Sequence, residues 1–254
     1  MAGQGRLSLE AALELATLAG GAAMRYFRRD IAVERKGDGS PVTVADREAE
    51  QLAREWITKR FPGDAILGEE FGEAKGTTGR TWLLDPVDGT RTFIHGVPLW
   101  GSLVAVVEND VVLAGAAAFP GVGETIVAAP GEGCWHNGVR CRVSTVSQLS
   151  AATVLTTDEH GFLDPAGRRG WERLAGSATT VRTWGDCYGY LLVATGRAEV
   201  MVDARLNSWD SACLVPIIGE AGGVLTDLEG RRSWNLASAI ASNAALATEV
   251  RKCF

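Results

Sequence analysis

The sequence has few of the features that mark extracellular, membrane or nucleic-acid-binding proteins. Its five cysteines are scattered and never spaced Cys-x-x-Cys, so neither a zinc site nor a disulfide framework is indicated. No apolar run approaches the length needed to span a bilayer, and the N-terminus carries no signal pattern, so a cytoplasmic protein without membrane contact is expected.

The sequence also has fewer basic than acidic residues. Lys and Arg number 25 against 31 Asp and Glu, and the net charge of -6 argues against a broad nucleic-acid or anionic-membrane surface. An anionic substrate must therefore be attracted by local cations, which bound metal ions would supply.

Histidine is scarce as well. His95, His136 and His160 lie in unrelated contexts without the i, i+4 spacing of a helical metal site, so each is expected to be a surface or structural residue. His95 is the hardest to dismiss, because it follows closely on the acidic stretch described next.

What the sequence does contain is an acidic stretch between residues 68 and 93. Residues 82–84 form a short apolar run with strand character, and Pro86 predicts that this strand stops at Asp85. Asp88 follows three residues later and Glu69 precedes, so three carboxylates would repel one another unless a cation lay between them. Mg²⁺ takes oxygen ligands of this kind and usually brings substrate phosphate with it. The alternative is that both aspartates form turns and cap helices.

The neighbouring motifs decide between these interpretations. Gly68-Glu69-Glu70, Asp85-Pro86-Val87-Asp88-Gly89-Thr90 and Trp209-Asp210-Ser211-Ala212, with Glu220-Ala221-Gly222-Gly223, resemble the signatures of the inositol monophosphatase superfamily of metal-dependent phosphatases. The resemblance covers nearly the whole chain. It implies an α/β (α+β) layered sandwich of the inositol monophosphatase and fructose-1,6-bisphosphatase type, with alternating helix and sheet layers, and a homodimer.

The resemblance also assigns roles to individual residues. Two or three Mg²⁺ ions are expected on the carboxylates of Glu69, Asp85, Asp88 and Asp210 and on the backbone carbonyl of Val87. Glu69, Thr90 and Asp46 are expected to be catalytic, with the Thr90 hydroxyl beside Glu69 orienting the attacking water and Asp46 contacting metal or water. The amides of Gly89 and Thr90 are expected to bind phosphate, and Lys36 belongs to a flap over the metals.

Further strings indicate the substrate. Gly96-Val97-Pro98-Leu99-Trp100 and the segment 184–190 resemble the branch of the superfamily that contains histidinol-phosphatases. A pocket for the cationic amine and imidazole of histidinol phosphate should present carboxylates, and Asp186 and Asp203 are the candidates. The alternative for Asp186 is a cap on a helix beginning near Cys187. Arg205 lies near the same pocket and would instead favour a second anionic group.

Three functions follow from these residues. The leading one is hydrolysis of L-histidinol phosphate to L-histidinol and phosphate in histidine biosynthesis, by in-line attack of a metal-activated water. The second is an inositol-1-monophosphatase or a broad sugar and polyol monophosphatase. The third, outside enzymology, is a regulatory protein that binds the transcription machinery.

Periodicity predicts the remaining organisation. Helices are expected over residues 7–27, 44–59, 166–175, 188–195, 209–221 and 243–252, and strands over 66–67, 82–85, 99–107, 111–119, 125–129, 152–155, 181–183, 199–203 and 224–227. The change from consecutive strands to alternating short strands and helices places a boundary near residue 145. Residues 1–145 then form an N-terminal α+β subdomain with most metal ligands, and residues 146–254 a C-terminal α/β subdomain with Asp210 and the substrate-side pocket.

Overall fold

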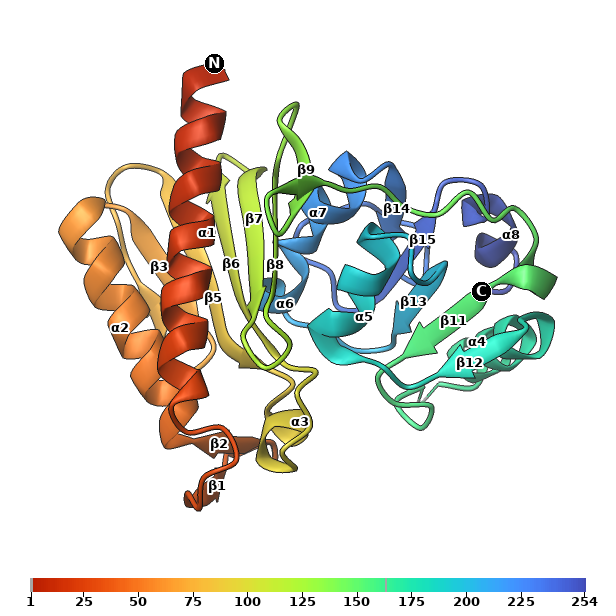
Figure 1. Cartoon of the computed structure of the whole chain (residues 1–254), viewed down its shortest axis with the longest axis horizontal. Coiled ribbons are helices and arrows are strands. Elements are labelled where there is room, and N and C mark those ends of the chain that lie inside the picture. Colours follow the sequence, from red (N-terminus) through yellow and green to blue (C-terminus); the bar gives the residue numbers. More distant parts are fainter. Residues whose placement is uncertain (1, 163) are drawn as a thin grey trace.

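Helices and sheets alternate in five layers (Figure 1). The computed structural model describes residues 2–162 and 164–254, with the backbone alone for residues 2–7. Helices α1 (Ala2–Met24) and α2 (Val44–Arg60) cover one face of a large sheet, and α5 (Asp186–Ala194) and α7 (Leu214–Glu220) fill the space between this sheet and a smaller one. Helices α4 (Pro165–Ser177) and α8 (Ala247–Arg251) cover the outer face of the smaller sheet. The layered fold expected from the sequence is confirmed.

The large sheet has eight strands in the order β10-β9-β8-β7-β6-β5-β3-β4. Only the β3–β5 pair is parallel, and the other neighbours in this sheet are antiparallel. The strands are β3 (Ala65–Gly68), β4 (Gly72–Ala74), β5 (Arg80–Asp88), β6 (Gly101–Glu108), β7 (Val111–Phe119), β8 (Glu124–Ala129), β9 (Gly133–His136) and β10 (Val139–Arg140).

The smaller sheet has five strands in the order β12-β11-β13-β15-β14. They are β11 (Thr153–Thr156), β12 (Thr180–Arg182), β13 (Val200–Asp203), β14 (Gly223–Thr226) and β15 (Ala239–Asn243). Strand β11 is parallel to both of its neighbours, so the carboxyl ends of β11 and β13 lie side by side. A separate hairpin joins β1 (Val33–Arg35) to β2 (Pro41–Thr43).

The shorter helices are α3 (Thr90–Ile94), α6 (Ser208–Ser211) and the 3₁₀ helix η1 (Leu149–Ala151). Helix α2 begins with a capping box, because the Thr43 hydroxyl accepts the Ala45 N–H at 3.1 Å and Asp46 Oδ2 accepts the Thr43 N–H at 2.8 Å. Within the described residues, no helix combines the length and apolar character that crossing a membrane requires.

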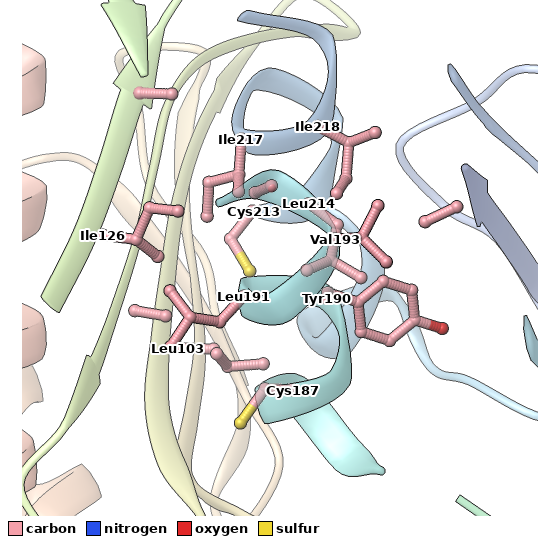
Figure 2. Close-up of a cluster of buried hydrophobic side chains, with 14 of the residues drawn as sticks. Leu103, Ile126, Cys187, Tyr190, Leu191, Val193, Cys213, Leu214, Ile217 and Ile218 are labelled. Atoms are coloured by element: carbon pink, nitrogen blue, oxygen red, sulfur yellow. The ribbon is translucent and has the colours of Figure 1, made fainter. Parts of the chain in front are cut away.

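The central layer explains why α5 and α7 are apolar on most sides. Leu103 and Ile126 from the large sheet pack against Leu191 and Ile217 on these two helices, as Figure 2 shows. The opposite side of α5 meets the inner face of the small sheet, where Met201 is fully buried. A helix covered by a sheet on each side has no solvent face to keep polar.

Three sequence predictions about these elements are wrong. Strand β5 does not stop at Asp85 but continues to Asp88, with a register irregularity at Pro86. Such an irregularity accommodates the missing N–H of proline, and the Ser102 hydroxyl donates to the Pro86 carbonyl there at 2.5 Å. The helix expected over 209–221 is divided into α6 and α7, and the helix expected from residue 243 begins four residues later because 239–243 is strand β15.

The two sheets lie on either side of residue 145, but the helices of the second half do not stay with the second sheet. Helix α7 packs against β7 and β8, and α6 against β5. One hydrophobic core therefore takes residues from both halves of the chain. The division into two subdomains at residue 145 stays a prediction.

Candidate metal and phosphate site

Three carboxylates from distant parts of the chain converge at the end of β5. One oxygen each from Asp85, Asp88 and Asp210 lies within 4.8 Å of the others. Asp85 and Asp88 flank the irregularity of β5, where Asp85 Oδ1 accepts the Val87 N–H at 3.0 Å. Asp210 comes from the first turn of α6, where its Oδ2 accepts the Asn207 N–H at 2.7 Å. The convergence of Asp210 with the β5 aspartates is the arrangement expected from the sequence.

The electrostatics of this cluster favour a bound cation. Burial, followed by repulsion from Glu69, Asp88 and Asp210, raises the pKa of Asp85 well above its ordinary value. Burial likewise raises the pKa of Asp210 to about 7. Among the described residues no Lys or Arg forms an ion pair with these three aspartates. A buried set of carboxylate oxygens without a protein cation is the donor set that Mg²⁺ prefers, so the residues fit the metal.

Glu69 stands beside this cluster and is held by the flap. Lys36 Nζ, in the β1–β2 hairpin, lies 2.7 Å from Glu69 Oε1 and 2.6 Å from Glu70 Oε1. Burial raises the pKa of Glu70 to about 7 in spite of this ammonium group. The β1–β2 hairpin therefore brings one positive charge to the edge of the acidic cluster, and its role as a flap over the metals stays a prediction.

Thr90 is the first residue of α3 and lies on the other side of the cluster. Its Oγ1 is 3.1 Å from Asp46 Oδ1 and 3.0 Å from the Val87 carbonyl oxygen. Within the described structure these are its hydrogen-bond partners, and the placement of the Thr90 hydroxyl beside Glu69, which the resemblance implies, stays a prediction. Burial raises the pKa of Asp46. Gly89 precedes Thr90 with φ of 84°, a left-handed conformation that suits glycine and turns the chain from β5 into α3.

A cleft of about 320 Å³ opens beside the aspartates and extends to the substrate-side residues. Asp88 and Asp210 line one part of it, and Asp186, Asp203 and Arg205 line the rest. The three substrate-side residues predicted from the sequence therefore share one cavity with the acidic cluster.

Asp203 ends β13 and is almost fully buried. Its Oδ1 accepts the Thr157 N–H at 3.1 Å and its Oδ2 accepts the Tyr190 hydroxyl at 2.9 Å. Burial raises the pKa of Asp203 to about 6, because these two donors only partly replace water around the charge. Arg205 is exposed at the rim of the cleft and has no hydrogen-bond partner among the described residues.

Asp186 does not act as the cap of α5. The helix begins without a side-chain cap at Gly185, and the Cys187 N–H instead donates to Asp88 Oδ2 at 2.5 Å. The Asp186 carboxylate turns away from the helix and accepts the Thr92 hydroxyl at 2.8 Å. The alternative interpretation of Asp186 as a capping residue is therefore wrong, and the carboxylate is available to the cleft.

Several residues in this region escaped the sequence analysis. Arg91 and His160 line the cleft. Nothing in their local sequence marks them, because Arg91 merely follows Thr90 and His160 lies in a loop. His95 and His136 lie elsewhere, where they contact the Arg91 carbonyl and Glu124. These contacts agree with the expectation that the histidines are surface or structural residues, and His160 is exposed at the cleft.

Glu50 on α2 was also missed. It is fully buried, and its carboxylate accepts the Glu70 N–H at 2.7 Å and the Phe71 N–H at 3.2 Å. It thus holds the turn that follows Glu69. The small size of Gly68 is needed here, since a Cβ at that position would lie 2.1 Å from Glu50 Oε1.

Solved structures share this arrangement of layers. The extragenic suppressor protein SuhB from Bartonella henselae superposes with a TM-score of 0.89 at 27% identity, covering 96% of both chains. An inositol monophosphatase (IMPase) from Thermotoga maritima superposes with a TM-score of 0.87 at 33% identity, covering 98% of this chain and 96% of that one. With the acidic cluster and its cleft, these similarities define a metal-dependent phosphomonoesterase.

Sequence comparison gives the family. The model of the inositol monophosphatase family matches residues 7–253, and the chain belongs to that family of Mg²⁺-dependent phosphomonoesterases. The histidinol-phosphatase of Chlorobaculum parvum is 46% identical over 226 residues, which cover 89% of this chain and 87% of that protein. The histidinol-phosphatase of Mycobacterium tuberculosis is 37% identical over 232 residues, 89% of each chain. The resemblance read from the sequence motifs is confirmed.

Proposed function

We propose that this phosphomonoesterase hydrolyses L-histidinol phosphate to L-histidinol and phosphate. The observation that carries the proposal is the placement of Asp186 and Asp203 in the same cleft as Asp88 and Asp210. A substrate whose phosphate lies at the metal end can extend its ammonium and imidazole toward the two other carboxylates. Relatives that are named histidinol-phosphatases support this choice.

Glu69, Asp85, Asp88, Asp210 and the Val87 carbonyl would hold two or three Mg²⁺ ions. When bound, the ions supply positive charge to the phosphoryl oxygens and lower the pKa of a water nucleophile. The proximity of the three aspartates supports this assignment.

The chain itself orients the reacting groups. If the Thr90 hydroxyl donates its hydrogen bond to Asp46, its lone pairs can accept a hydrogen bond from the attacking water and direct that water toward phosphorus. The first N–H groups of α3, including those of Gly89 and Thr90, are groups that a helix leaves unpaired, and they can donate to phosphate oxygens. Lys36 holds Glu69 from the flap.

The test is a side-by-side measurement of kcat/KM for histidinol phosphate and inositol 1-phosphate with Mg²⁺. A clear preference for histidinol phosphate is expected, and a preference for the inositol ester would refute the proposal. Asp186→Asn should selectively weaken turnover of histidinol phosphate. Little change in that variant would favour a less discriminating enzyme.

A second candidate, a broad inositol or sugar monophosphatase, is favoured by the exposed Arg205 and by Arg91 at the same cleft. Two cations suit an additional anionic group better than an ammonium. A relative from Thermotoga maritima, 34% identical over 227 residues, is named fructose-1,6-bisphosphatase/inositol-1-monophosphatase. Turnover of sugar bisphosphates above that of histidinol phosphate would support this candidate.

The place in histidine biosynthesis, the homodimer and the cytoplasmic location are parts of the same proposal. Size-exclusion chromatography with light scattering tests the dimer, and rescue of a strain that lacks histidinol-phosphatase tests the pathway. A regulatory role through the transcription machinery requires polymerase binding without phosphatase activity.

A further inference from the structure

We infer that Thr157 is a positioning residue that holds the carboxylates of Asp186 and Asp203 in place. Through them it determines the preference for a substrate with a cationic leaving group. The inference rests on the proposed function. Thr157 directly follows β11, at the carboxyl end that lies beside the end of β13, and it lines the cleft.

Thr157 contacts both acidic residues through different atoms. Its N–H donates to Asp203 Oδ1 at 3.1 Å, and its Oγ1 accepts the Asp186 N–H at 2.8 Å. One residue therefore links the end of β13 to the start of α5. No other residue in the described structure forms hydrogen bonds to both Asp186 and Asp203.

The hydrogen bond to Asp186 supports an unusual backbone. Asp186 has φ of 51°, in the left-handed region that is unfavourable for a residue with a Cβ. The two chain segments also touch, since a Cβ on Gly185 would lie 2.3 Å from Thr157 Cα. Without the Thr157 hydroxyl, the Asp186 N–H would lose the acceptor that the described structure provides for it.

This backbone conformation determines where the carboxylate lies. Asp186 Oδ2 packs against Gly89, where a Cβ would approach to 2.9 Å, and accepts the Thr92 hydroxyl at 2.8 Å. The other oxygen of this carboxylate, Asp186 Oδ1, has no hydrogen-bond donor among the described residues. A fixed carboxylate with a free oxygen recognises an ammonium better than a mobile one, because less conformational freedom is lost on binding.

The experiment compares Thr157→Val, which keeps the shape and removes the acceptor, with Thr157→Ser, which retains it. Histidinol phosphate and glycerol phosphate, which lacks a cation, are the two substrates. For Thr157→Val, kcat/KM for histidinol phosphate should fall about 10-fold, mainly through KM, as expected for one lost buried hydrogen bond. Glycerol phosphate should lose less, and Thr157→Ser should restore the ratio of the two kcat/KM values. Thr157→Ala provides the same loss of the hydroxyl should the valine variant fold poorly.

Thr180→Val is the matched control, because Thr180 lies in the edge strand β12 of the same sheet, away from the cleft. Equal losses on both substrates in Thr157→Val and Thr157→Ala would overturn the inference, since they would indicate a general structural role. Failure of the proposed function would look different. The wild-type protein itself would then show no preference for histidinol phosphate.

Discussion

Two sets of carboxylates lie in and beside the cleft, and they differ in crowding and in hydrogen-bond donors. Oxygens of Asp85, Asp88 and Asp210 lie within 4.8 Å of one another, and burial together with repulsion from neighbouring carboxylates raises the pKa values of these residues. Asp186 and Asp203 are outside this group, although Asp186 is close enough to raise the pKa of Asp88, and they accept hydrogen bonds from the hydroxyls of Thr92 and Tyr190. The first set is arranged to need an external cation. The second is arranged as fixed acceptors for a substrate.

The difference teaches how one fold builds two kinds of acidic site. Repelling carboxylates store unfavourable energy that a metal relieves, so the site gains affinity for Mg²⁺ at the expense of stability without it. Carboxylates held by side-chain hydroxyls are fixed in place, so they contribute orientation instead. The experiments below test this contrast.

The largest effect is expected from Asp85→Asn. With Mg²⁺, kcat/KM should fall about 1,000-fold or more, because the metal loses a buried anionic ligand. Without metal, the same variant should be more stable than the wild type, because one of the repelling charges is gone. Activity assays and thermal unfolding in excess chelator measure the two effects.

Asp110→Asn, in the exposed turn between β6 and β7, is the control for this pair of measurements. The pH dependence adds a second check. The pKa of Asp210 is raised from the ordinary aspartate value of 3.8 to about 7 in the folded protein. The free energy of unfolding of the metal-free protein should therefore fall as the pH rises from 3.8 to 7. A stability of the metal-free protein that rises over this interval would contradict the proposed repulsion.

Asp203→Asn should have the next largest effect. Turnover of histidinol phosphate should fall about 30-fold in kcat/KM, as expected when one charge of a buried pair is removed, with a smaller loss for glycerol phosphate. Burial raises the wild-type pKa to about 6, so the carboxylate is charged above that pH and neutral below it. The wild-type kcat/KM should therefore fall more steeply than that of the variant as pH decreases through 6. Parallel pH profiles would show that Asp203 does not face the cationic part of the substrate.

Glu50→Gln should affect the metal set alone. Glutamine has one acceptor oxygen and a donating NH₂ group where Glu50 has two acceptor oxygens, so one of the Glu70 and Phe71 N–H groups would lose its acceptor and the turn that carries Glu69 should loosen. Loss of such outer support should weaken Mg²⁺ binding about 10-fold, measured by calorimetry in the absence of substrate. The ratio of kcat/KM for histidinol phosphate to that for glycerol phosphate should stay constant at saturating Mg²⁺. A changed ratio would mean that the two acidic sets are not independent.

The smallest effect is expected outside the cleft, at Glu124. This carboxylate accepts hydrogen bonds from Arg197 at 2.7 Å and from the Tyr188 hydroxyl at 3.0 Å, and these bonds outweigh burial and lower its pKa. Glu124→Gln should reduce the free energy of unfolding by about 1 kcal/mol at neutral pH, since Arg197 is partly exposed. The difference between wild type and variant should disappear as pH falls through the lowered pKa. Denaturant unfolding at neutral and acidic pH tests this prediction. The kcat/KM of the variant for histidinol phosphate should equal that of the wild type.

Much of the metal set could be predicted because its members are close in the sequence. Asp85 and Asp88 lie three residues apart, and the motif around them contains its own turn chemistry in Pro86 and Gly89. The strand bounds around them were less predictable. Pro86 predicted an early end of β5. The strand continues because its register with β6 shifts at Pro86 and the Ser102 hydroxyl donates to the Pro86 carbonyl.

The sequence alone determined the fold class, the family and the acidic character of both sites, because these depend on residue type and local order. Only the tertiary structure decided that Thr90 pairs with Asp46, that Asp186 accepts the Thr92 hydroxyl, and that Thr157 and Asp186 meet between two elements. Each of these contacts joins residues that are distant in the chain. The physical reason is that such contacts form through the packing of layers, which local periodicity does not record.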